Sequence, residues 1–422
     1  MHYKTPGVHI VEKNAFPSSV VAVETAVPAF VGYTQRADNA GNGLARQPWR
    51  IGSLAEYEHF FGDPAQARFS LHDCLALFFL NGGGPCYIVS VGDYSAAVES
   101  DALSAGIDLL LKEQEPTLLV IPEAMLLDEP ECIEVQQAML AHCAHMQSRM
   151  AILDVWGGWK SRSDGADCVA DFRDHIGDRY LDYAAAYYPW LNTAAAGQAD
   201  RLLPPGAAIA GIYTMVDNTR GVWKAPANVC LAGITSPSVV VTSQEQEDLN
   251  TSLQGKSINA IRSFGGEGVL VWGGRTLDGN SPDWRYVNVR RTMIMIEQSC
   301  KLAMRALVFE PNTANTWVTA ESMLLNFLTG IWKQGGLAGA TPADAFDVRI
   351  GLGETMTADD ILDGILRVAV RVAVVRPAEF IQITFQQMQT ELIQRTTMNM
   401  LGNQVENAGT KVTSISAKMS AP

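Results

Sequence analysis

Residues 366–385 read LRVAVRVAVVRPAEFIQITF, two runs of alternating residues that are joined at Arg376-Pro377. In the first run, Arg367 and Arg371 fall on one side and the apolar residues on the other, namely Leu366, Val368, Val370, Val372 and Val374. In the second run, residues 379–386, the apolar positions of the same alternation are Ile381, Ile383 and Phe385. Side chains of a strand point alternately to its two faces, so both runs predict β-strands with one buried and one solvated face.

The junction between these runs does not fit a tight hairpin. A two-residue hairpin turn favours Asn-Gly or Asp-Gly, and neither pair occurs at this point. Pro377 has no N–H and a fixed φ, and it restricts Arg376 to extended geometry. The junction therefore favours a chain that runs on, so that the second strand pairs elsewhere. A local hairpin with a loop of about three to five residues is the alternative.

The N-terminus offers a second strand of the same kind. Pro6-Gly7 is followed by the short β-type run Val8, His9, Ile10 and Val11, and then by polar residues and Pro17. The run stands apart from the core, which begins with the apolar stretch 20–34. We therefore expect residues 1–19 to form an N-terminal arm.

Composition places the chain among ordinary globular proteins and against several functions. Its 422 residues are 47% hydrophobic and 18% charged, enough for two or three domains with real cores. A formal net charge of −14 argues against a nucleic-acid-binding protein. The N-terminal sequence lacks a signal-peptide core, and no apolar stretch reaches membrane-spanning length, so we expect synthesis in the cytoplasm and no direct membrane insertion. Seven scattered cysteines indicate reduced thiols.

Two patterns divide the rest of the chain. Helix-like and strand-like pieces alternate through residues 20–245, with compact apolar strands in CYIVSVG, TLLVIP and MAILDVW, which indicates an α/β layer domain. Residues 246–376 predict an α+β domain, in which VLVWGGRTL (269–277) and WRYVNVRR (284–291) are interpreted as strands. Residues 377–422 form a C-terminal arm and tail. The fold class is therefore α/β and α+β, multidomain, with extended terminal arms.

Three helices are predicted within residues 246–376. The first carries apolar residues at three- and four-residue spacing from Met293 to Leu307. The second presents an apolar face from Trp317 to Ile331, with Asn315 as its N-cap and a stop at Gly335-Gly336. The third is short and begins with a capping box of Thr357 and Asp360.

The sequence contains only weak signals for catalytic, cofactor or metal sites. NTSLQGKS (250–257) fills the last three places of a phosphate-binding loop, but Asn250 stands where the first glycine is needed. His142 and His145 share a helix face, yet no second cluster supplies further zinc ligands. No GxSxG elbow occurs, and no nucleophile and base come together. We therefore expect no catalytic residue, no cofactor and no metal site, and no enzymatic activity.

A series of segments resembles the contractile tail sheath proteins of phages, R-type bacteriocins and extracellular contractile injection systems. In chain order they are PGVHIVEK, TAVPAFVG, GVWKAPAN, GKSINAIRSFGGEGVLVWGGRTL, WRYVNVRR, VFEPNTANTW, NFLTGIWKQGGLAG, GLGETMTADDILDG and RPAEFI. They cover more than half of the chain, mostly between residues 255 and 387. Residues 53–204 match only loosely, as is usual for the outer, variable part of such proteins. The chain also continues to residue 422, whereas family members typically end soon after the RPAEFI strand.

The resemblance implies a structural subunit that polymerises helically around an inner tube and contracts to drive the tube through a target envelope. Terminal arms in this family add strands to the inner-domain sheet of neighbouring subunits. The subunit-linking residues would be Val8, His9, Ile10, Val11, Phe380, Ile381, Ile383 and Phe385. The acceptor strand would carry Val368, Val370, Val372 and Val374.

The implied partners are further copies of the chain, an inner tube protein, other sheath paralogues, and baseplate and cap components. Arg367 and Arg371 share a strand face and are candidates for contact with acidic groups on the inner tube; a solvated sheet face is the alternative. The helix Asn315–Gln334 is another inward-facing candidate, although its apolar stripe fits a core. A non-contractile tail-tube or baseplate component is the competing function, and a nucleotide-binding α/β enzyme is a more distant one.

Overall fold

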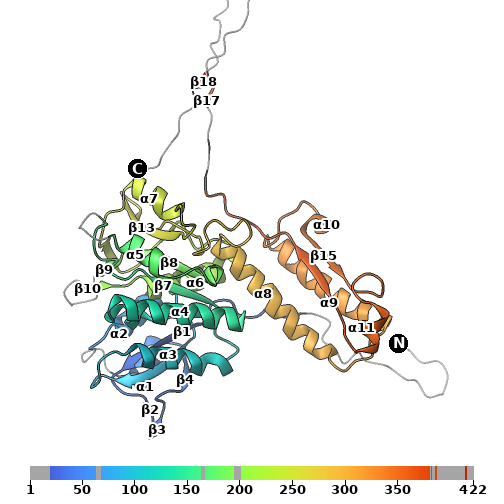
Figure 1. The fold of residues 1–422 in the computed structure, drawn as a ribbon, viewed down its shortest axis with the longest axis horizontal. Coiled ribbons are helices and arrows are strands. Elements are labelled where there is room, and N and C mark those ends of the chain that lie inside the picture. The colour runs from blue at the N-terminus through green and yellow to red at the C-terminus, as the bar shows by residue number, and fades with distance from the viewer. Residues whose placement is uncertain are drawn as a thin grey trace, which may run out of the picture. The chain divides into compact units, whose positions relative to one another are not determined.

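The computed structural model describes residues 20–62, 68–162, 167–193 and 201–380, together with Gln382 and the strand residues 385–386 and 414–415. The chain forms two compact units, residues 1–376 and 377–422. In the second unit, β17 (Phe385–Gln386) pairs antiparallel with β18 (Ser414–Ile415). The first unit holds the elements from β1 to β16 (Figure 1).

A nine-stranded mixed sheet forms the centre of the first unit, in the order β11-β14-β13-β8-β7-β6-β1-β5-β4. The six strands from β13 to β5 in this order run parallel, and they are β1 (Pro28–Thr34), β5 (Cys86–Asp93), β6 (Leu118–Val120), β7 (Met150–Asp154), β8 (Ala184–Tyr188) and β13 (Ile258–Phe264). Antiparallel strands close both edges: β4 (Pro48–Ile51), β14 (Gly268–Val271) and β11 (Val229–Cys230). The three apolar strands expected from CYIVSVG, TLLVIP and MAILDVW are β5, β6 and β7; parallel strands covered on both faces carry such continuous apolar runs.

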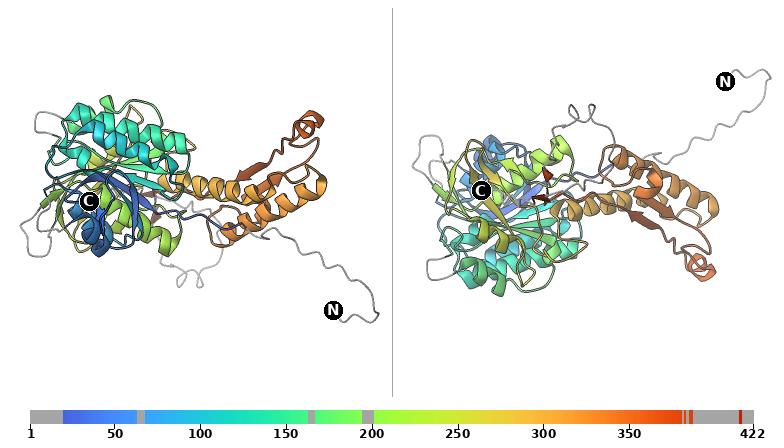
Figure 2. Two further views of the ribbon diagram at one scale, coloured as in Figure 1. Left: turned by 90° about the horizontal axis from the view of Figure 1, so that it is seen from below. Right: turned by 90° about the horizontal axis from the view of Figure 1, so that it is seen from above.

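Helices cover both faces of this sheet, which gives three layers (Figure 2). One face packs against α3 (Ser100–Leu109), α4 (Glu129–Met146) and α5 (Cys168–His175). The other packs against α1 (Leu54–Phe61), α2 (Leu71–Leu80) and α6 (Gly206–Arg220). Smaller elements complete this part: β2 (Asp38–Asn39), β3 (Asn42–Gly43), β9 (Leu191–Thr193), β10 (Arg201–Leu203), β12 (Ile234–Pro237) and α7 (Ser243–Asn250). We call residues 24–286 the sheet body.

A separate hydrophobic cluster lies around two long helices, α8 (Val287–Met304) and α9 (Ala314–Lys333). These helices form an antiparallel hairpin, on which α10 (Pro342–Ala345), β15 (Phe346–Arg349), α11 (Ala358–Leu362) and β16 (Ala369–Val372) are placed (Figure 1). We call residues 287–376 the hairpin body. The apolar face predicted for α9 is buried in its core, with Ala320, Leu324, Leu328 and Ile331 at 4% exposure or less. No helix within the described ranges is long and apolar enough to span a membrane.

The mixed α/β character expected from sequence is confirmed, and two local interpretations are corrected. The strand predicted over VLVWGGRTL (269–277) ends at Val271, the last residue of β14. WRYVNVRR (284–291) is not a strand, because α8 begins within it at Val287. Asn288 and Arg290 lie in this helix start and are buried, with 1% and 5% exposure. The Asn288 amide donates hydrogen bonds and Arg290 contacts aromatic rings, so the start of α8 is an internal polar cluster.

The ends of the shorter predicted helices are close to those expected. The capping box of Thr357 and Asp360 is present, with each side chain bonded to the other residue's backbone N–H. The N-cap of α9 is Thr313, two residues before the expected Asn315. The predicted boundary at residues 245–246 lies within the sheet body, because β13 follows it and pairs with β8. The division into a variable outer and a conserved inner part stays a prediction.

Two carboxyl groups are buried in the sheet body without a cation partner among the described residues. Glu123 is fully buried and accepts hydrogen bonds from the backbone N–H groups of Tyr33 (2.6 Å) and Leu71 (3.3 Å). Burial raises the pKa of Glu123 to about 8, and these two bonds oppose the shift only in part. Asp154, at the end of β7, accepts one bond from the N–H of Gly206 (2.7 Å), and burial raises its pKa to about 7.

These two groups predict a protein that loses stability as the pH rises. The folded chain keeps a proton on Glu123 that the unfolded chain releases above about pH 4.5, so its contribution is full below that pH and is lost through about pH 8. Urea unfolding across this range should show a falling free energy of unfolding, with a flatter slope in Glu123→Gln. Asp154→Asn is the matched comparison, because it removes the other buried carboxyl group. An equal slope in the native chain and in Glu123→Gln would show that Glu123 is already ionised in the folded chain.

Candidate assembly surfaces

The first turn of α8 joins the two bodies through a buried ion pair. Arg291 contacts the carboxylate of Asp217 on α6 at 2.6 and 2.9 Å, and the two side chains are 4% and 3% exposed. Arg291 also donates to the backbone oxygen of Thr25 (2.9 Å), while the Thr25 hydroxyl donates to Asp217 (2.6 Å). The guanidinium lies 4.6 Å from the ring centre of Tyr213. One arginine thus holds α8, α6 and the segment that leads into β1.

Arg290, the preceding residue, attaches α8 to the sheet body by ring contacts. Its guanidinium carbon lies 3.9 Å from the ring centre of Tyr183 and 4.4 Å from that of Trp284. Asp182 approaches it at 3.4 Å; burial raises the pKa of this carboxyl, and the arginine opposes that shift. A planar guanidinium suits such stacking better than a lysine ammonium does.

Asn288 fixes the place where the chain leaves the hairpin body. Its side-chain amide donates to the backbone oxygens of Trp223 (2.9 Å) and Val375 (3.0 Å). The N-terminal side is held along the same helix, since the N–H of Val23 donates to the Ser299 hydroxyl (3.0 Å) and Val20 is buried in the hairpin-body core. Both arms therefore start from segments anchored to α8, at Val20 and at Val375.

The hairpin body carries the candidate acceptor sheet. β15 and β16 pair antiparallel, with Val348 opposite Val370 and Phe346 opposite Val372. Val368, Val372 and Val374 of the predicted apolar face pack against the α9 core, whereas Val370 on the same face is 37% exposed. In the described part of the chain this sheet has two strands, so each strand has one edge that is free to pair with a further strand. On the outer edge of the β16 segment, a single bridge between Val374 and Leu337 is already present.

The two candidate tube-binding arginines are both exposed, with different surroundings. Arg367 donates to Asp360 at 2.8 and 3.0 Å. These bonds, together with the bond from the Thr357 N–H, lower the pKa of the Asp360 carboxyl to about 2. Arg371 lies opposite Asp347 in the β15–β16 register. Asp347 itself pairs with Arg349 at 2.8 Å. Arg367 is thus engaged within the chain, and its contact with a tube stays a prediction.

The residues expected to link subunits lie mostly beyond the described ranges. Val8, His9, Ile10, Val11, Ile381 and Ile383 fall outside them. Phe380 is described and 76% exposed, and Phe385 lies in β17. Among the described residues β16 pairs with β15 and β17 pairs with β18, so strand exchange and the local hairpin both stay predictions.

The weak chemical motifs have structural roles. Lys256, the lysine of the partial phosphate-loop motif, is buried and donates to the backbone oxygen of Arg173 (2.6 Å) while it pairs with Asp178 (2.9 Å). His142 contacts the buried Arg149 at 3.0 Å, and burial together with that cation lowers the pKa of His142 to about 4. The described residues contain no group of three or more side chains suited to a metal ion.

Sequence reasoning missed the polar cluster at the start of α8, although a signal was present. The apolar spacing of the predicted helix extends backward from Met293 to Val289, which places Asn288, Arg290 and Arg291 inside its first turn. Nothing in the sequence indicates Asp217 or Thr25 as partners of Arg291, because those residues are 74 and 266 positions away and meet it only through the fold.

Comparisons with known proteins match this architecture. The model of the phage tail sheath protein central domain matches residues 96–277, and that of the phage tail sheath C-terminal domain matches residues 280–388. The chain is 33% identical to the PVC sheath complex of an extracellular contractile injection system in its contracted state, with TM-score 0.73 over 94% of this chain and 99% of that one. The chain therefore belongs to the contractile tail sheath family.

Other relatives agree. The helical sheath of the anti-feeding prophage (AFP) in its contracted state is 37% identical, with TM-score 0.73 over 92% of this chain and 100% of that chain. A putative prophage major tail sheath protein of Pseudomonas aeruginosa is 26% identical over 49% of this chain and 50% of its own length. The tail sheath protein of Enterobacteria phage T4 is 27% identical over 33% of this chain and 21% of its own length. The alignments thus span half or less of these two curated relatives.

We expect the ion pair of Arg291 and Asp217 to be strongly coupled. Arg291→Met leaves a buried carboxylate without its cation, and Asp217→Asn leaves a buried guanidinium without its anion, so each should lower the free energy of unfolding by roughly 3–5 kcal/mol. The double variant should lose much less than the sum of both, as measured by urea unfolding in a double-mutant cycle. Additive losses would show that the two side chains act independently.

Proposed function

We propose that this chain is the structural subunit of a contractile sheath, which polymerises helically around an inner tube and contracts to drive that tube through a target envelope. The observation that carries the proposal is the two-stranded sheet β15–β16, whose open edges lie on the body that also anchors Val20 and Val375, close to the start of each arm. The match to contracted-state sheath structures over more than nine-tenths of the chain supports it.

We infer that the terminal arms complete this sheet in neighbouring subunits. Each open edge presents backbone N–H and C=O groups, and an added strand would satisfy them. Residues 379–386 and Val8–Val11 have the alternating, β-branched pattern of such strands. Pro377 stands at the exit, just after Val375 is fixed by Asn288, which directs the chain onward. Links of this kind would persist while weaker contacts between subunits rearrange in contraction.

The remaining roles follow from this assembly. Arg367 and Arg371 are the proposed contacts to acidic groups of the inner tube, and they lie on the β16 side of the hairpin body. Other sheath paralogues, baseplate components and a cap are the further partners. Two similar structures come from AFP baseplates, at 35% and 29% identity, which favours a position close to the baseplate as a second candidate for this chain. We place its synthesis in the bacterial cytoplasm, before assembly into a tail-like particle.

Removal of the arms tests the proposed exchange. Deletion of residues 1–15 or 377–422 should leave a folded monomer, because the described cores lie within residues 20–376. Such monomers should form no tubes in negative-stain electron microscopy, since the open edges of β15 and β16 then find no donor strand. Normal tubes formed by both truncated chains would contradict the proposed exchange of strands.

Charge reversal tests the proposed tube contact. Arg367→Glu with Arg371→Glu should weaken co-sedimentation of the sheath with its inner tube, most clearly at low salt, where exposed charges are least screened. Arg349→Glu with Arg220→Glu is a matched control with two other basic side chains of the same unit. Equal tube binding by both double variants and the native chain would remove Arg367 and Arg371 from the interface.

A further inference from the structure

The turn between α8 and α9 presents an aromatic side chain directly to solvent. Phe309 is fully exposed, and Val308 beside it is 58% exposed. Phe309 has a φ of 72°, a left-handed conformation that is sterically unfavourable for a residue with a bulky side chain. Leu307, buried at 7% exposure, anchors the turn from below, and the N–H of Glu310 donates to its carbonyl oxygen (3.1 Å). The turn thus holds an apolar projection outward.

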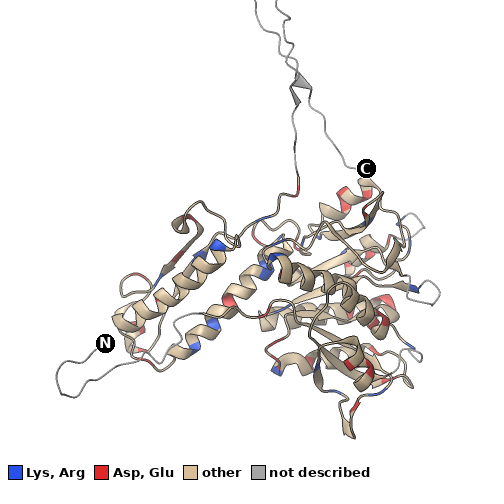
Figure 3. Ribbon diagram, turned by 180° about the vertical axis from the view of Figure 1, so that it is seen from behind, with Lys and Arg blue, Asp and Glu red and all other residues tan. Residues whose placement is uncertain are grey.

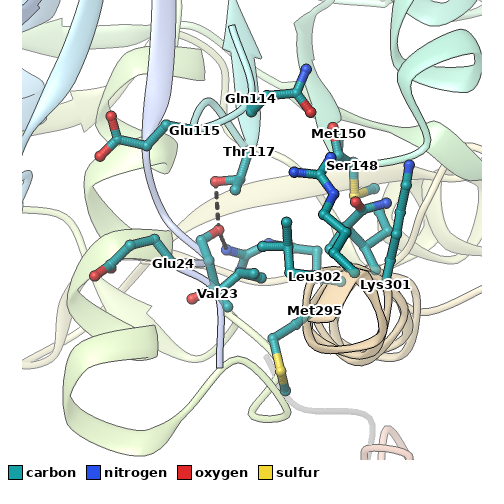
Figure 4. Close-up of a pocket in the computed structure, with 15 residues that line it drawn as sticks. Val23, Glu24, Gln114, Glu115, Thr117, Ser148, Met150, Met295, Lys301 and Leu302 are labelled. Carbon is teal, nitrogen blue, oxygen red and sulfur yellow. Dashed lines mark hydrogen bonds between the residues drawn. The ribbon is translucent and has the colours of Figure 1, made fainter. Parts of the chain in front are cut away.

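A groove of about 310 Å³ lies along α8, beside residues 291–302 (Figure 4). Val23 and Thr117 line one wall, and Met295 and Leu302 of α8 line the opposite wall. Its apolar floor includes Met150. The groove is therefore an apolar slot between the sheet body and α8, of a size that accepts an aromatic side chain.

The charges beside the two features are complementary. Lys301 and Arg305 line the α8 side of the groove and are exposed, and within the described residues neither forms an ion pair. Glu24 and Glu115 line the other side, where Glu115 pairs with Arg50, so the basic charge of the groove is confined to α8. Glu310, next to Phe309, is likewise exposed and has no ion-pair partner in that part of the chain. Basic residues recur along α8, whereas acidic residues are frequent over the sheet body (Figure 3). Salt bridges of exposed groups are weak alone, but they select register and partner.

We propose that Val308 and Phe309 of one subunit insert into the α8 groove of a second copy of the chain, with Glu310 facing Lys301 and Arg305. The projection and the groove occupy different places on one chain, so the contact can repeat head to tail from copy to copy, as the proposed helical sheath requires. This inference rests on the proposed function, because it assigns a contact between copies within the sheath, and it is separate from the exchanged strands.

Photo-crosslinking tests the contact directly. The full chain, with p-benzoylphenylalanine in place of Phe309, is assembled from a mixture of isotopically heavy and light subunits and irradiated. Crosslinked peptides should join position 309 of one copy to residues 291–305, 114–117 or 148–150 of another. The matched control carries the same photoreactive residue at Leu253, which is fully exposed in the sheet body. Crosslinks from position 309 to the tube protein, a baseplate protein or another part of the sheath overturn the proposal.

Assembly of variants tests the energetics. Phe309→Ala should raise the concentration needed for polymerisation roughly tenfold or more, as removal of an aromatic anchor does, whereas Leu253→Ala should leave it unchanged. Glu310→Lys and Lys301→Glu should each impair assembly, and their combination should restore part of it. Native-like assembly by Phe309→Ala overturns this contact alone. Failure of the native chain to polymerise overturns the proposed function and this contact with it.

Discussion

The buried ion pair of Arg291 and Asp217 is the interaction on which the arrangement of this subunit depends. Removal of two charges from water is costly unless each finds its partner with good geometry, and Thr25 contributes both a hydroxyl donor and a carbonyl acceptor to this cluster. A shift of α8 relative to α6 would separate the charges in a dry environment. The pair therefore selects one placement of the hairpin body on the sheet body, and it also fixes the path of the entering chain.

The neighbouring residues of α8 extend this control to both ends of the chain. Asn288 holds Val375, the last residue but one before Pro377, and Ser299 holds Val23. In a polymer linked by exchanged strands, force on an arm would reach α8 first and the sheet body next. Arg290, stacked between Tyr183 and Trp284, resists that force with contacts that depend little on salt. Rearrangement in contraction would then occur between subunits, while each subunit moves as a unit.

Much of this fold is predictable from the sequence. The parallel strands β5, β6 and β7 are short apolar runs, the buried face of α9 has a clear 3.6-residue period, and the capping box of α11 is a local signal. The start of α8 is not, because WRYVNVRR alternates like a strand and its buried polar residues find their partners only in three dimensions. The same holds for Glu123, whose isolation depends on packing from three segments. Phe309 gives no signal in sequence, since its φ and exposure are properties of the folded turn.

The central claim is that β15 and β16 form the middle of a larger sheet built from several chains. Cryo-electron microscopy of the assembled particle, before and after contraction, measures this directly. The account predicts that both open edges carry strands from other copies of the chain, one from an N-terminal arm and one from residues 379–386, and that these pairings are the same in both states. Edges that remain unpaired, or that pair with arms of their own chain in either state, would contradict it.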